Sequence, residues 1–158
     1  MEPSLRDFLQ ISYDDLEKMN LEVKADRVAR ISDEAAKDKR MKYLKDEKRI
    51  KAVTVCFTDL EGRMHMLDYD KKFLLGSYDN LSFDGSSIRG FSQQHESDLR
   101  LKLDWASFYW LPSDVFGPGN VFIFADVCTR EGDPYAADIR SKLKSYMNEI
   151  YKKDKTVL

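Results

Sequence analysis

The sequence predicts an α+β protein in which a small sheet of about five strands has helices before and after it. Two observations predict this order. The first fifty residues place apolar side chains at helical spacing among dense charges, whereas apolar and polar residues alternate through much of 52–127. From residue 138 the period becomes helical again. Helices followed by strands and then by a helix are typical of an α+β domain.

The N-terminal region, residues 1–50, reads as charged helices. Ser4 can cap a first short helix, Ser12 with Asp15 marks a second start, and Ser32 marks a third. The basic stretch KDKRMKYLKDEKRIK (37–51) could contact nucleic acid. Its interleaved acidic residues favour a solvated helix face instead.

The strands begin where Val53, Val55 and Phe57 alternate with polar or small residues. The Leu60–Arg63 segment contains Gly62 and predicts a turn, after which RMHMLDY (63–69) returns as the paired strand. Further strands are expected at 99–103, within 105–112 up to Pro112, and at 121–127.

The C-terminal part starts a new helix, for which Asp138 is the expected N-cap. A new strand is expected to begin in KKDKTVL (152–158). We therefore divide the chain into a charged helical region (1–50), a sheet domain of the ubiquitin-like kind (51–130) and the start of a further domain (131–158).

Composition and charge exclude several classes of function. Of 158 residues, 42% are hydrophobic, and 26 basic against 28 acidic residues give a net charge of -2, so we expect neither nucleic acid nor an anionic membrane as a partner. No apolar run approaches the length of about 18 residues that spans a bilayer, and no secretory leader is visible. Cys56 and Cys128, isolated in apolar runs, predict buried thiols in a reduced, cytoplasmic protein.

Most motifs that carry chemistry are missing. The sequence contains no phosphate-binding glycine loop, no CxxC, no HExxH and no Glu-x-Glu pair on a strand. His65 lies in an alternating strand pattern and His95 lies thirty residues away, so we interpret His65 as a structural residue and expect no metal ligands in this chain.

The stretch FDGSSIRGF (83–91) is the main candidate for a site. Gly85 would permit unusual backbone angles, and Ser86 and Ser87 can hydrogen-bond the carboxylate of Asp84. An ionised Asp84 could attract a small cation or accept a proton from an ammonium-like group. The alternative is an Asx-turn in which Asp84 binds only its own backbone, and spacing alone favours that alternative.

A longer pattern around this loop decides between the two. FDGSSIRGFSQQHESDLRLKLD (83–104) resembles the signature of the N-terminal domain of class I (bacterial-type) glutamine synthetase, a β-grasp domain. VTVCFTDLEGRMHML (53–67) is similar to that family's preceding hairpin, and FIFADVCTREGDPYAADIR (122–140) to its following strand and helix start. The resemblance covers roughly residues 51–151. Phe91 stands where many members have Trp, and Ile139 replaces a usual Pro.

The resemblance implies a glutamate–ammonia ligase of nitrogen metabolism, which uses ATP to make glutamine from glutamate and ammonia. Asp84 matches the aspartate that binds and deprotonates ammonium, Gly85, Ser86 and Ser87 shape its loop, and Phe91 is expected near the nucleotide. In the family this loop completes the active site of a neighbouring subunit in a ring-forming homo-oligomer, usually a dodecamer.

The resemblance also implies what this chain lacks. The family's Mg²⁺ or Mn²⁺, ATP and glutamate ligands would follow residue 158, so we expect this segment alone to bind no cofactor and to be inactive. Two alternatives stay open. One is a γ-glutamyl-amine ligase of the same superfamily, and the other is a non-catalytic module that binds a full-length synthetase.

Overall fold

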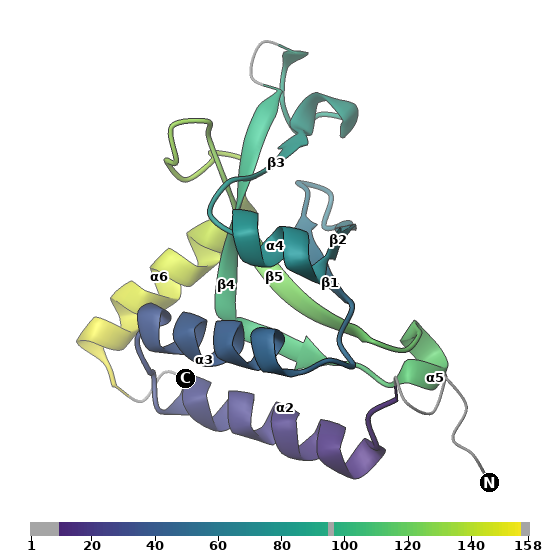
Figure 1. The fold of residues 1–158 in the computed structure, drawn as a ribbon. Coiled ribbons are helices and arrows are strands. Elements are labelled where there is room, and N and C mark those ends of the chain that lie inside the picture. The colour runs from purple at the N-terminus through teal and green to yellow at the C-terminus, as the bar shows by residue number, and fades with distance from the viewer. Residues whose placement is uncertain (1–9, 95–96, 156–158) are drawn as a thin grey trace, which may run out of the picture. The chain divides into compact units, whose positions relative to one another are not determined.

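The computed structural model describes residues 10–94 and 97–155 (Figure 1). Its elements are α2 (Tyr13–Val28), α3 (Asp33–Asp46), β1 (Ala52–Thr58), β2 (Met64–Asp70), α4 (Lys71–Ser77), β3 (Leu81–Asp84), the 3₁₀ turn η1 (Gly85–Ser87), β4 (Asp98–Trp110), α5 (Ser113–Phe116), β5 (Asn120–Cys128) and α6 (Ile139–Lys153). The five strands form one sheet in the order β2-β1-β5-β4-β3. The predicted α+β fold of about five strands, with helices before and after, is confirmed.

The predicted helix starts inside the described residues are also confirmed. Ser12 accepts a hydrogen bond from the backbone N–H of Asp15, and Ser32 accepts one from Ala35, at 3.2 Å each. Asp138 caps α6 in the same way. The helix predicted at Ser4 lies outside the described residues. The strand predicted from Lys152 is wrong at its start, because α6 extends to Lys153, and 156–158 lie outside the described residues.

The predicted strands differ from the observed ones in the middle of the chain. The two expected at 99–103 and within 105–112 are one continuous strand, β4, since no turn residue separates them. Along β4 buried residues alternate with more exposed ones until Ser107 and Phe108, which are both buried. The strand β3 was not predicted. Its four residues pair antiparallel with β4, with Leu81 opposite Leu101. The short helix α4 was not predicted; Asp70 caps it by accepting from the N–H groups of Lys72 and Phe73.

No helix in the described residues is both apolar and long enough to cross a membrane. Cys56 and Cys128 are buried, as predicted, and burial raises the pKa of the Cys128 thiol.

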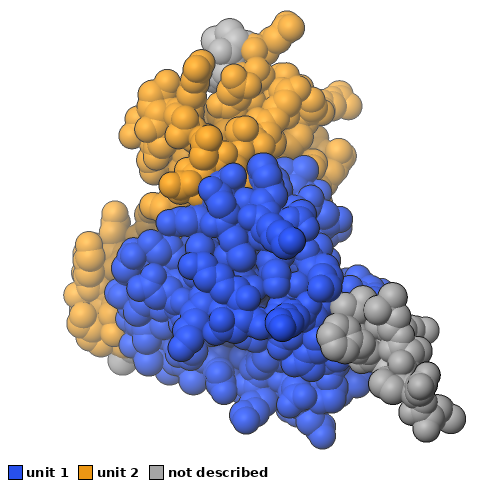
Figure 2. Space-filling view, in the orientation of Figure 1, with its two compact units in different colours: residues 1–55, 66–78, 104–124 blue, residues 56–65, 79–103, 125–158 orange. Residues whose placement is uncertain are grey.

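The chain divides into two compact units, which Figure 2 colours separately. Unit 1 contains residues 1–55, 66–78 and 104–124. Within it, Asp26 of α2 binds Lys39 and Arg40 of α3 at 2.8 and 2.6 Å. The side-chain amide of Asn20 exchanges two hydrogen bonds with the main chain of Trp110. The prediction of a solvated face for 37–51 is therefore wrong at Arg40, which is buried in this ion pair.

Unit 2 contains residues 56–65, 79–103 and 125–158. It therefore includes the β1–β2 turn, the Asp84 loop and the segment after β5, so each of the three stretches that carry the sequence resemblance contributes to it. The candidate site is built inside this unit. The division of the chain at residues 50 and 130 stays a prediction.

Candidate functional site

The Asp84 carboxylate is held by its own loop. Asp84 is the last residue of β3 and the N-cap of η1. Its Oδ1 accepts hydrogen bonds from the backbone N–H of Ser86 at 3.0 Å and from the Ser86 hydroxyl at 2.6 Å. Its Oδ2 accepts from the Ser87 hydroxyl at 2.6 Å. The Asx-turn that spacing alone favours is thus present, with two hydroxyl donors added to it.

These hydrogen bonds keep Asp84 ionised while it stays exposed to solvent. Donation by the Ser86 hydroxyl, and then by the Ser87 hydroxyl, holds the pKa of Asp84 below its ordinary value. An ionised carboxylate offers about four acceptor positions. The two serine hydroxyls and the Ser86 N–H donate to it, and the Ser87 N–H also lowers its pKa. Because Asp84 is exposed, its carboxylate can also accept from solvent or from a bound cation.

Gly85 is needed for space rather than for its backbone angles. Its φ lies outside the left-handed region, so the expectation of unusual angles is wrong. A Cβ at this position would lie 2.6 Å from Leu99 Cδ1 and 2.8 Å from Ser92 Oγ. Leu99 is buried in β4, and the Gly85 N–H donates to the Ser97 carbonyl at 2.8 Å. The loop therefore lies directly on the neighbouring strand.

Phe91 ends the loop in an aromatic cluster inside unit 2. The side chain is 3% exposed, and its ring lies 6.3 Å from the rings of Phe57 and Phe83 and 5.4 Å from that of Tyr135, measured between centroids. The Tyr135 hydroxyl donates to the Phe91 carbonyl at 2.8 Å. Because its ring packs among these aromatic side chains, Phe91 anchors the end of the loop in the interior of unit 2.

The family is shown by a sequence comparison. The family model described as the glutamine synthetase β-grasp domain matches residues 49–130, more than half of the chain. This chain belongs to the glutamine synthetase β-grasp family. The match includes the β1–β2 turn, the Asp84 loop and the whole of β5.

Individual relatives agree with this membership. The glutamine synthetase of Thermotoga maritima is 34% identical over 110 residues, which are 69% of this chain and 25% of that protein. That of Methanosarcina mazei is 34% identical over 107 residues, which are 67% of this chain and 24% of that protein. The chain thus spans about a quarter of the length of these relatives.

Solved structures show the same fold. A cryo-EM structure of Plasmodium falciparum glutamine synthetase matches with a TM-score of 0.65 and 26% identity, covering 73% of this chain and 22% of that one. A structure of GmaS without ligand matches with a TM-score of 0.60 and 25% identity, covering 68% of this chain and 25% of that one.

Asp98 is the cross-strand neighbour of Asp84 in this glutamine synthetase domain, a pairing that the sequence did not predict. It lies directly opposite Asp84 in the register of β3 and β4, and it is exposed. Only the pairing register of β3 and β4 connects Asp98 with Asp84.

His65 of β2 contacts the β1–β2 turn, and the structural role predicted for it stays a prediction. Its Nε2 lies 2.8 Å from Asp59 Oδ2, and its ring stacks on Phe57 with 5.3 Å between centroids. Asp59 is buried, and its Oδ1 also accepts from the backbone N–H groups of Glu61 and Arg63, both at 2.9 Å. The hydrogen bond with His65 lowers the pKa of Asp59.

The metal ion implied by the family does not fit the residues that the structure describes. Among residues 10–94 and 97–155, no group of three His, Cys, Asp or Glu side chains is arranged to hold a metal ion. His95 and Glu96 lie outside these ranges. We therefore assign no chemical step to a metal ion in this chain. The candidate site consists of Asp84, Ser86 and Ser87, and it is supported by the packing of Gly85 and Phe91.

Proposed function

We propose that this chain acts as the N-terminal part of a glutamine synthetase and that its Asp84 loop supplies the carboxylate that binds ammonium. The observation that supports this most strongly is the state of Asp84. An exposed carboxylate, kept ionised by two hydroxyl groups, lies in a loop of the matching family.

The loop offers ammonium several oxygen acceptors. An ammonium ion has four N–H donors and no lone pair, so it is recognised by acceptors and by negative charge. The exposed Asp84 carboxylate can accept a further hydrogen bond. The hydroxyls of Ser86 and Ser87 donate to Asp84, and their own lone pairs are therefore free to accept from the cation.

Binding and deprotonation place different demands on Asp84. A low pKa favours the anionic form that attracts ammonium, but it makes the carboxylate a weak base. We propose that Asp84 binds the cation and takes one proton from it, which leaves ammonia with a lone pair. The nitrogen then forms a bond to the acyl carbon of the phosphorylated glutamate, the bond from that carbon to the phosphate oxygen breaks, and phosphate leaves with a second proton from the nitrogen. The proton on Asp84 is then released to solvent.

The remaining parts of the active site belong to other residues. We propose that ATP, Mg²⁺ or Mn²⁺ and glutamate bind to the catalytic part of a neighbouring subunit in a ring-shaped homo-oligomer, a dodecamer in the full-length protein. The matched residues make up about a quarter of the length of these relatives. Phe91 would lie near the nucleotide while its buried ring supports the loop. The 158-residue chain alone would be inactive.

The substitution Asp84→Asn in the full-length enzyme tests the role of the carboxylate. It keeps the shape of the side chain but removes the negative charge, so ammonium-dependent glutamine formation should fall by about 100-fold or more, the range typical of a lost acid–base group. ATP should still bind with normal affinity. Both are measured by steady-state kinetics and nucleotide titration.

The matched control is Asp79→Asn, an exposed carboxylate just before β3. It should leave turnover unchanged. A normal rate for Asp84→Asn would remove the proposed role of the loop, and equal losses in both variants would show that only the general negative charge of this region matters.

Two further assays separate the alternatives. The isolated chain, given Mg²⁺ or Mn²⁺, ATP and glutamate, should form no glutamine, and appreciable turnover would contradict the proposed division between subunits. A comparison of ammonium with putrescine as the acceptor in the full-length enzyme would reveal a γ-glutamyl-amine ligase if the larger amine were preferred.

A further inference from the structure

The Asp84 loop, residues 84–91, is held in unit 2 by different contacts at its two ends. At its entry, β3 pairs with β4 and the Gly85 N–H donates to the Ser97 carbonyl at 2.8 Å. The bonds among Asp84, Ser86 and Ser87 lie within the loop, so they shape it without attaching it to the rest of the unit. The exit of the loop, at Phe91, needs a separate attachment.

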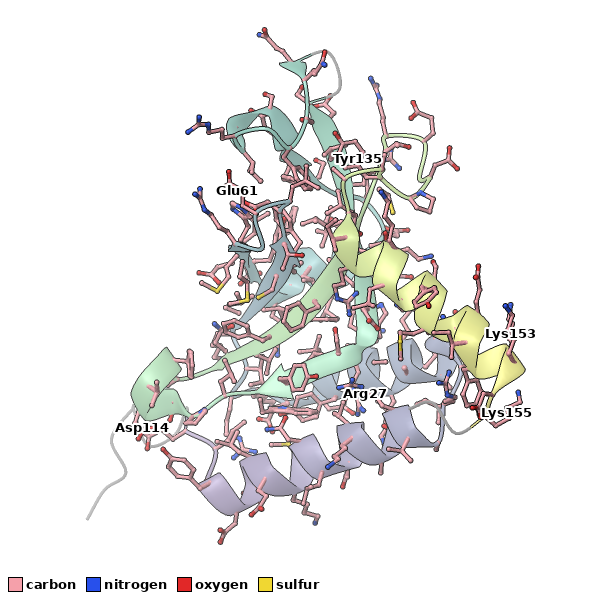
Figure 3. The ribbon with its side chains drawn as sticks, turned by 180° about the vertical axis from the view of Figure 1, so that it is seen from behind. Arg27, Glu61, Asp114, Tyr135, Lys153 and Lys155 are labelled. Carbon is pink, nitrogen blue, oxygen red and sulfur yellow. The ribbon has the colours of Figure 1, made fainter. Side chains whose placement is uncertain are left out.

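Tyr135 provides this attachment. Its hydroxyl donates to the Phe91 carbonyl at 2.8 Å, and its ring lies 5.4 Å from the Phe91 ring. Both side chains belong to unit 2, although 44 residues of sequence separate them. Figure 3 labels Tyr135 in the segment that leads into α6.

Tyr135 is itself held firmly. Its N–H donates to the Val127 carbonyl at 2.9 Å, and its carbonyl accepts from the Asp138 N–H at 3.0 Å. Cys128 and Pro134 form a β-bridge beside it. The buried carboxylate of Asp138 accepts from the Val127 N–H at 2.8 Å. The main chain of Tyr135 is thereby tied to the end of β5 and to the start of α6.

We infer that Tyr135 is a positioning residue for the ammonium site, acting through the Phe91 carbonyl. By fixing the exit of the loop, it holds Asp84 and Ser87 in the arrangement that accepts the cation. This inference rests on the proposed ammonium-binding role of the loop. A loop that is ordered for a smaller fraction of the time would bind ammonium more weakly, in proportion to that fraction.

The test compares Tyr135→Phe with Tyr146→Phe, an exposed tyrosine on α6. The first readout is amide hydrogen exchange in the 158-residue chain. Loss of the hydroxyl should speed exchange at the Ile88 and Phe91 amides, which close the turns of the loop, by about fivefold, as expected for one hydrogen bond. The Val127 and Asp138 amides should stay protected, and Tyr146→Phe should change neither pair.

The second readout is kinetic and uses the full-length enzyme. Tyr135→Phe should raise the KM for ammonium at least threefold, while the KM for glutamate and kcat at saturating ammonium stay within twofold. Unchanged loop exchange would overturn the inference, and so would faster loop exchange with an unchanged ammonium KM, because Tyr135 would then support only the fold. Equal acceleration of all four amides would also overturn it.

The proposed function and this inference can fail separately. A normal rate for Asp84→Asn removes the ammonium role of the loop, whatever Tyr135→Phe does. A large loss in Asp84→Asn, combined with a normal ammonium KM in Tyr135→Phe, removes only the positioning role of Tyr135.

Discussion

In two turns of unit 2, an aspartate carboxylate accepts hydrogen bonds from its own turn. One of these carboxylates is buried and the other is exposed. Asp59 in the β1–β2 turn is buried and accepts from two backbone N–H groups and from His65. Asp84 is exposed and accepts from one backbone N–H group and from two serine hydroxyls. The pKa of both carboxyls is lowered, each by its hydrogen bonds.

The difference shows that a lowered pKa does not by itself distinguish an aspartate that stabilises a turn from one that is proposed to bind a ligand. The donors to Asp59 are backbone groups of the turn and a ring stacked on Phe57, so its charge serves the fold. The donors to Asp84 are mainly hydroxyls, which keep lone pairs of their own for a ligand. Exposure and donor type distinguish the two, and this comparison can be tested.

The largest effect on stability should come from Gly85→Ala, which disrupts the packing of the Asp84 loop against β4. The added Cβ would lie 2.6 Å from the Leu99 side chain, which is buried and cannot easily move away. Overpacking of this kind costs about 1–3 kcal/mol of unfolding free energy. Urea denaturation of the 158-residue chain measures the loss.

Gly76→Ala in α4 is the matched control, because a Cβ there meets nothing within 4 Å and the residue is helical. It should stabilise the chain by about 0.5–1 kcal/mol, as alanine does when it replaces glycine in a helix. An equal loss of stability in both variants would contradict the close packing inferred at Gly85.

Asp59→Asn should shift the urea midpoint downward, and Asp84→Asn should shift it less, because only Asp59 is buried. The pH dependence follows from the direction of the pKa shifts. Since both folded-state pKa values lie below the unfolded value of about 4, the folded chain binds fewer protons and these carboxylates stabilise it above that pH.

This stability is lost as the pH falls below about 4 and through the folded-state pKa values. The Asp59→Asn chain should therefore lose less stability between neutral and acidic pH than the unsubstituted chain does. Urea midpoints at several pH values measure this. Identical pH profiles for the two chains would mean that the Asp59 hydrogen bonds do not stabilise the fold.

The smallest effect should be that of Ser87→Ala, which removes one of the two hydroxyl donors to Asp84. The pKa of Asp84 should rise, because its ionised form loses a hydrogen bond, while the pKa of Asp59 should not change. An NMR titration of the side-chain carboxyl carbons follows both groups in one experiment. An unchanged pKa for Asp84 would show that Ser87 does not stabilise the anion.

Local sequence patterns were sufficient for the helix starts and for most of the sheet. Ser12, Ser32 and Asp138 are caps because a short polar side chain can reach the N–H groups two or three residues onward. The alternation of Leu99, Leu101 and Leu103 correctly placed one buried face of β4. These signals act over a few residues and need no tertiary partner.

Among the elements that were not predicted, β3 and α4 show why short segments are difficult to recognise in a sequence. β3 has four residues, and its pairing with β4 is what makes it a strand. α4 has seven residues and follows β2 without a loop, so its single cap at Asp70 was hidden in a strand pattern. Short elements are stabilised mainly by their neighbours, which a periodicity does not contain.

The sequence by itself determined the α+β class and the family and predicted the Asp84 loop as the candidate site, because all three depend on the order of residue types along the chain. Only the tertiary structure decided what that loop rests on. Leu99 excludes a side chain at Gly85, Asp98 faces Asp84, and Tyr135 holds the Phe91 carbonyl. Such contacts depend on register and packing between segments far apart in sequence, and no local pattern encodes them.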